Sequence, residues 1–89
     1  MITVIGTHEV KDAKAWRTGF DAHETARVGA GVKVNGVYAS VENPNLITIS
    51  MQFPSKEVLD GMMNSPEMQK TMADAGVIGK TEFLVLNQI

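Results

Sequence analysis

Residues 46–53 read LITISMQF, and every second residue from Ile47 to Phe53 is apolar. The residues between them are Thr, Ser and Gln. This alternation with a period of two is typical of a β-strand that buries one face and exposes the other. The chain on both sides of this strand then indicates the fold to which it belongs.

Three further strands and two helical regions follow from the positions of β-branched residues, capping residues and glycines. Strands are predicted over 2–10, 32–42 and 81–89, with a turn at 43–45 and a helix from about Asp12 to about Val28. A second helical region follows Pro54 with Ser55 as its cap, breaks at Ser65-Pro66-Glu67 and ends at Gly76. The order β-α-β-β-α-β predicts one ferredoxin-like α+β domain over 1–89, with a four-stranded antiparallel sheet and both helical regions on one face.

The composition excludes several classes of function. The chain has 89 residues, a net charge of -2 and no Cys. A general nucleic-acid binder concentrates Lys and Arg. RNA-recognition domains carry an aromatic and basic signature on the third strand, where bases stack, but the strand over 46–53 has no basic residue and one terminal aromatic, Phe53. No apolar stretch approaches the length needed to span a membrane, and no signal peptide is evident, so a cytoplasmic protein without nucleic-acid or membrane partners is expected.

The last strand indicates self-association. Phe83 and Val85 point to one face of the sheet, whereas Leu84 and Leu86 point to the other, and Tyr38 and Leu46 add further apolar surface. A sheet that is apolar on both faces usually has both faces covered, and a domain of this size buries only a modest share of its surface alone. We therefore expect a homodimer, with a different protein partner as the alternative.

The first predicted helix carries an unusual stripe. At about 100° per residue, Trp16, Phe20, His23 and Arg27 fall on one face. In one interpretation the end of this stripe emerges from the core, His23 is a half-buried hydrogen-bonded residue and Arg27 extends to solvent. In the other, both residues face a cavity, where His23 exchanges a proton near neutral pH and Arg27 holds a carboxylate or enolate oxygen.

The second helical region is rich in methionine. Met62, Met63, Met68 and Met72 recur at helical spacing, which is typical of a plain core but also of adaptable apolar binding surfaces. Together with the aromatic residues they predict a mostly apolar pocket with a few polar groups, as is common for ligand sites. The predicted ligand-binding residues are Trp16, Phe20, His23, Arg27, Tyr38, Met51, Phe53, Met62 and Met72, with His23 the candidate catalytic residue.

The sequence offers little for a metal ion or a phosphate. Its only histidines are His8 and His23, and His8 with Asp12 would supply too few ligands for a closed metal site. The run Gly76-Val77-Ile78-Gly79-Lys80-Thr81 ends like a phosphate-binding loop, but Asp74 occupies the position of the first Gly of that loop. The run also leads from a helix to a strand, the reverse of what the loop requires. We expect no bound metal.

Four stretches of the sequence form a recognisable set of motifs: His8-Glu9-Val10-Lys11-Asp12 with Trp16, Phe20, His23 and Arg27; Glu42-Asn43-Pro44-Asn45; Ser65-Pro66-Glu67; and residues 72–79. Together they resemble the small antibiotic-biosynthesis-monooxygenase-like proteins of the dimeric α/β-barrel (ferredoxin-like) superfamily. The resemblance covers nearly the whole chain and implies a homodimer with two sheets packed face to face, and a cavity between sheet and helices in each protomer. The superfamily includes monooxygenases that need no cofactor, lactone isomerases, polyketide cyclases and haem enzymes. The haem branch is not expected here, because neither histidine has the setting of an axial ligand, and no cofactor is predicted.

Three functions remain open. The first is binding of a largely apolar small molecule with an acidic or carbonyl end, fatty-acid-like or polyketide-like, between helices and sheet. The second is a cofactor-independent monooxygenase, cyclase or isomerase in which His23 acts as base and Arg27 or Tyr38 stabilises an oxyanion. The third is a non-catalytic interaction protein whose cavity is filled by side chains.

Overall fold

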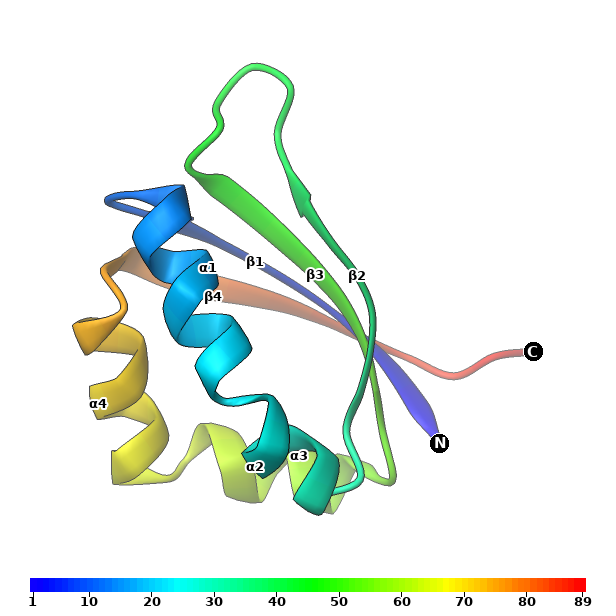
Figure 1. Cartoon of the computed structure of the whole chain (residues 1–89). Helices are drawn as coiled ribbons and strands as arrows, with labels where there is room; N and C mark the ends of the chain where they lie inside the picture. The colour runs from blue at the N-terminus through cyan, green and yellow to red at the C-terminus, as the bar shows by residue number, and fades with distance from the viewer.

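The computed structural model describes every residue from Met1 to Ile89. It has four strands and four helices in the order β-α-α-β-β-α-α-β (Figure 1). The strands are β1 (Ile2–Val10), β2 (Lys33–Ala39), β3 (Leu46–Phe53) and β4 (Val77–Leu86). The helices are α1 (Ala13–Ala22), α2 (Glu24–Gly29), α3 (Lys56–Met63) and α4 (Pro66–Asp74), and none has the length and apolar character needed to cross a membrane.

The four strands form one antiparallel sheet in the order β2-β3-β1-β4. The central pair, β1 and β3, runs without irregularity from Ile2 opposite Phe53 to Glu9 opposite Leu46. All the helices cover the same face of the sheet (Figure 1). The predicted ferredoxin-like fold is confirmed.

The hydrophobic core lies between this covered face and the helices. Burial alternates along β3, where the apolar residues of the 46–53 pattern are buried and the polar ones are not, so this strand is confirmed residue for residue. The same period of two on β1 buries Val4 and Val10. The nine apolar residues of the core are Val4, Val10, Trp16, Val32, Ile47, Ile49, Met51, Phe53 and Leu59.

The second helical region breaks where the sequence predicts, with α3 ending at Met63 and α4 beginning at Pro66. Ser55 caps α3, because its Oγ accepts a hydrogen bond from the Val58 N–H at 3.3 Å. Ser65 occupies the corresponding position of α4, but its side chain makes no capping hydrogen bond. The Ser-Pro pair therefore stops one helix and starts the next mainly through Pro66, whose fixed φ suits a first helical turn.

Two strand boundaries differ from the prediction. The strand predicted over 32–42 ends at Ala39, because the Ser40 hydroxyl accepts hydrogen bonds from the Glu42 and Asn43 N–H groups and turns the chain early. The last strand spans Val77–Leu86 instead of 81–89, because Val77 already pairs with Val10 of β1. Gly76, with a φ of 84°, makes the abrupt change from α4 into this strand possible.

The uncovered face of the sheet carries exposed apolar side chains. Leu84 lies opposite Ile5 in the pairing of β4 with β1, and the side chain of Leu84 is 60% exposed. Leu86 and Ile78 of the same strand are also exposed on this face, together with Tyr38 of β2. This face therefore exposes apolar surface that no element of the chain covers.

Candidate functional site

A cavity of about 440 Å³ lies between the helices and the covered face of the sheet. Fifteen of its 23 lining residues are hydrophobic, and its volume falls within the range of roughly 300–1,000 Å³ that ligand pockets usually have. Eight of the predicted site residues line it: Trp16, Phe20, His23, Arg27, Met51, Phe53, Met62 and Met72. The methionines come from α3, α4 and β3, so three elements contribute flexible apolar side chains to the cavity lining.

An aromatic stack runs along α1 on one side of the cavity. Trp16 and Phe20, one turn apart, stack with ring centroids 4.9 Å apart and planes inclined by 22°. The His8 and Trp16 rings form a T-shaped pair with centroids 5.4 Å apart, and the Arg27 guanidinium carbon lies 3.7 Å from the centroid of the Phe20 ring. The two polar side chains therefore occupy opposite ends of the stack, and the cation–π contact holds Arg27 in place.

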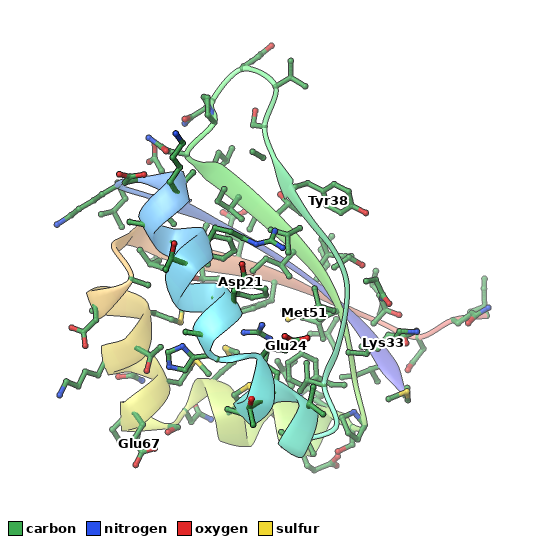
Figure 2. All side chains as sticks on the ribbon, viewed as in Figure 1. Asp21, Glu24, Lys33, Tyr38, Met51 and Glu67 are labelled. Carbon is green, nitrogen blue, oxygen red and sulfur yellow. The ribbon has the colours of Figure 1, made fainter.

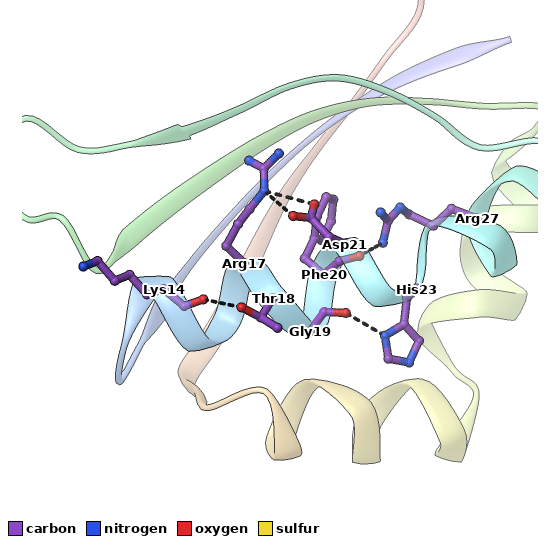
Figure 3. A network of polar contacts seen from close by, with 8 residues as sticks. All are labelled: Lys14, Arg17, Thr18, Gly19, Phe20, Asp21, His23 and Arg27. Atoms are coloured by element: carbon purple, nitrogen blue, oxygen red, sulfur yellow. Dashed lines mark hydrogen bonds and ion pairs between the residues drawn. The ribbon is translucent and has the colours of Figure 1, made fainter.

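The predicted helix over 12–28 is interrupted at His23, which ends α1 and precedes α2. The cause lies in side chains that bond to the last carbonyls of α1 (Figure 3). His23 Nδ1 donates to the Gly19 carbonyl at 2.8 Å, and Arg27 Nη1 donates to the Phe20 carbonyl at 2.7 Å. Side chains thus satisfy carbonyls that a continuing helix would pair with its own backbone N–H groups.

The hydrogen bond from His23 also fixes the state of its ring. A backbone carbonyl only accepts hydrogen bonds, so Nδ1 must carry a proton. In the neutral imidazole the lone pair is then on Nε2, the atom that could accept a proton or a hydrogen bond. The side chain is exposed at the cavity wall, where a bound molecule can reach it.

Arg27 is partly buried, and this burial lowers its pKa, an effect that the nearby Glu24 and Asp21 carboxylates oppose. The guanidinium nevertheless remains charged at neutral pH, since an arginine is effectively always protonated. It is therefore a fixed cation in the wall of a mostly apolar cavity, a setting in which charge-assisted hydrogen bonds are strong.

Two side-chain nitrogens are fully buried without a hydrogen-bond partner, namely His8 Nε2 and Arg27 Nε. Both residues line the same cavity. Buried polar atoms are nearly always paired, so an unpaired one calls for an explanation such as a ligand or an ordered water. Burial also lowers the pKa of His8, so this imidazole is neutral at pH 7.

Comparison with known proteins places the chain by its fold. No protein-family model and no curated protein matches the sequence. Among solved structures, a candidate antibiotic biosynthesis monooxygenase from Bordetella bronchiseptica matches with a TM-score of 0.74 and 14% identity, covering 99% of this chain and 96% of that one. A conserved protein from Methanosarcina mazei Go1 has a TM-score of 0.73 and 18% identity, covering 99% of this chain and 92% of that one. An antibiotic biosynthesis monooxygenase has a TM-score of 0.72 and 9% identity, covering 100% of this chain and 99% of that one. The chain has the ferredoxin-like fold of the antibiotic-biosynthesis-monooxygenase-like proteins.

Tyr38 is the one predicted site residue that does not line the cavity. It pairs with Thr48, on the uncovered face of the sheet, and its side chain is 59% exposed. Figure 2 shows it projecting beyond β2, whereas Met51 lies between the sheet and the helices. The register of β2 against β3 shifts between Val34 and Gly36, and this extra residue reverses the side to which Tyr38 points.

His8 is a buried polar residue of the cavity wall that the sequence does not predict as part of the site. The sequence suggests for it only the role of a metal ligand beside Asp12, but Asp12 caps α1 by accepting from the Lys14 N–H at 2.9 Å. The structure contains no group of three His, Asp or Glu residues that could hold a metal ion. Strand alternation could have revealed the role of His8, since it shares its parity with the buried Val4 and Val10.

Proposed function

We propose that this protein binds a small, largely apolar molecule with one acidic or carbonyl end in the cavity between its helices and its sheet. The observation that carries the proposal is the presence of both unpartnered buried nitrogens in one mostly apolar cavity. An apolar tail would displace water from the methionine and aromatic lining, and the acidic or carbonyl end would give Arg27 a partner. Fatty-acid-like and polyketide-like compounds have this character.

Arg27 is the residue to which we assign the acidic or carbonyl end. Its Nη1 is used by the Phe20 carbonyl, whereas its Nε has no partner in the protein. The contact with the Phe20 ring and the hydrogen bond to the same residue hold the guanidinium in place before a ligand arrives. Such preorganisation reduces the entropy that binding would otherwise cost.

The fluorescence of Trp16 provides the test, because it is the only tryptophan of the chain and it lines the cavity. Titration with decanoate should change this fluorescence and saturate, whereas decylamine, with an equal chain but a positive charge, should bind more weakly. Native mass spectrometry of the purified protein, followed by organic extraction, should detect any acid that co-purifies. If no acid or carbonyl compound of a broad panel binds, the proposal fails and the interaction role gains support.

We also infer that the uncovered face of the sheet pairs with a second copy of the chain. Exposed apolar residues on this face, including Leu84 and Leu86, support the inference, because such surface is normally covered. Analytical ultracentrifugation should give twice the protomer mass of 9.6 kDa. Leu84→Glu should yield monomer, whereas Val28→Glu, at an exposed position of α2, should leave the dimer intact. A monomer for the unaltered chain would contradict the inference.

A second candidate function is cofactor-independent catalysis, and the state of His23 favours it. With Nδ1 donating to the Gly19 carbonyl, Nε2 is available to take a proton from an acidic C–H or a phenol. Arg27, at the neighbouring wall, would stabilise the oxyanion that forms. Once a bound compound is known, a His23→Gln variant separates the two functions: loss of turnover by orders of magnitude indicates an enzyme, and only a modest loss of affinity indicates a binder.

A further inference from the structure

His8 and Arg27 line the same cavity and contact different rings of its aromatic stack. The His8 ring packs at 76° to the Trp16 ring, near the beginning of α1, whereas Arg27 covers Phe20, near its end. The two residues with unpartnered nitrogens therefore lie beside different rings, and a ligand that reaches both would extend along the stack.

The sheet is irregular at the position of His8. The register of β4 against β1 shifts between Thr7 and Glu9, so that His8 has no single partner on β4, although it faces Ile47 on the other side. Gly79, inside the shifted segment, has a φ of 72°, which other residues rarely adopt. Bulges of this kind are frequent next to functional sites, where they re-aim a side chain.

The burial and the charge state of His8 determine which ligand group can form a hydrogen bond with it. It is 8% exposed, so any group that meets its Nε2 must enter the cavity with it. Burial is the sole cause acting on its pKa, and it favours the neutral imidazole, which donates at one nitrogen and accepts at the other. A neutral hydroxyl pairs with either nitrogen, because it too can donate or accept, whereas a carboxylate would be left buried without a counter-charge.

We propose that His8 is a second polar anchor of this cavity and that the molecule bound there carries a hydroxyl group at the end opposite its acid. The inference rests on the proposed binding function and specifies its ligand: an apolar hydroxy acid with its carboxylate at Arg27, its chain along Trp16 and Phe20, and its hydroxyl at His8. The stack sets the separation between the two polar ends.

Calorimetric titration with decanoate and with its ω-hydroxy derivative tests the proposal on the unaltered protein. A hydroxyl buried in an apolar cavity without a partner weakens binding, so a preference for the hydroxy acid requires a partner for it. We expect the hydroxy acid to bind about tenfold more tightly, which corresponds to about 1.4 kcal/mol. Equal or weaker binding of the hydroxy acid, with decanoate bound normally, overturns the role of His8 and leaves the proposed function standing.

Variants of His8 complete the test. In His8→Phe the preference should reverse to favour decanoate, and in His8→Gln, which keeps a donor and an acceptor, part of the preference for the hydroxy acid should return. Thermal unfolding of each variant shows whether it is folded. If His8→Phe does not fold, the titration of the unaltered protein with the two acids decides whether the inference holds. An unchanged preference in a folded His8→Phe overturns the inference, and failure of both acids to bind the unaltered protein overturns the proposed function together with it.

Discussion

Replacement of Arg27 by Met removes the charge from the cavity while keeping most of the side-chain volume. The sulfur-containing side chain can still cover Phe20, so the apolar packing is largely retained. The Phe20 carbonyl loses its bond to Arg27 but keeps a hydrogen bond from the His23 N–H at 3.2 Å, so no carbonyl is left without a partner. The free energy of unfolding should therefore fall by no more than about 1.5 kcal/mol, the usual net value of one hydrogen bond.

The effect on binding should be larger and selective for acids. Hydrogen bonds to charged groups contribute about 1.5–3 kcal/mol, and about 1.4 kcal/mol corresponds to a factor of ten. Arg27→Met should therefore raise the Kd for decanoate by roughly ten- to hundredfold. The Kd for 1-decanol, which offers the same chain without a charge, should stay within a factor of about three, since the apolar lining of the cavity is unchanged.

Arg17→Met provides the matched control on the neighbouring helix. Arg17 does not line the cavity, and its guanidinium pairs with Asp21 at 3.0 Å on the surface, with both side chains more than half exposed. Such surface ion pairs contribute little to stability, so Arg17→Met removes a nearby positive charge without changing the lining of the cavity. Titration of Trp16 fluorescence with both ligands gives the four dissociation constants. Two results would refute the assignment of the carboxylate to Arg27. One is an equal loss of decanoate affinity in the two arginine variants, and the other is a loss of decanol affinity in Arg27→Met as large as its loss of decanoate affinity.

Two further predictions concern stability. Asp12→Ala should lower the free energy of unfolding by about 1 kcal/mol and the Tm by roughly 4–8 °C, because the Asp12 carboxylate accepts from two N–H groups of α1. Ser65→Ala should change the Tm little, because Ser65 makes no capping bond, and equal shifts of Tm in the two variants would contradict the cap assignment. Burial lowers the pKa of His8 below its value of 6.5 in the unfolded chain, so the unfolded state binds the proton more readily and stability falls as the pH drops below about 6.5. Urea unfolding between pH 7.5 and 5 should show a smaller fall in the free energy of unfolding for His8→Phe than for the unaltered protein. Parallel pH profiles for the two proteins would contradict this contribution of His8.

The fold could be predicted because its helices and strands are specified by patterns among residues that are close together in the sequence. The alternation over 46–53, the cap at Asp12 and the break at Pro66 each depend on a few neighbouring residues, and each is present in the structure. The cavity was anticipated from the same source, since helical spacing brings Trp16, Phe20, His23 and Arg27 to one side.

Two features could not be predicted from the sequence, the helix break at His23 and the orientation of Tyr38, because they depend on contacts between residues that are not neighbours in a regular element. At the break, the His23 side chain bonds to the Gly19 carbonyl and the Arg27 side chain bonds to the Phe20 carbonyl. Helical propensity does not encode this arrangement. In a regular strand Tyr38 would point to the same side as Val34, but the irregularity between Val34 and Gly36 turns it to the uncovered face, away from the predicted pocket. Such irregularities depend on the pairing of two strands and not on either strand alone.

A crystal structure of the protein with decanoate tests the central claim most directly. We expect the acid between the helices and the sheet, with its chain against Trp16 and Phe20 and its carboxylate within hydrogen-bond distance of Arg27. Decanoate bound elsewhere, or a cavity closed by its own methionine side chains in crystals that exclude the acid, would contradict the proposed function.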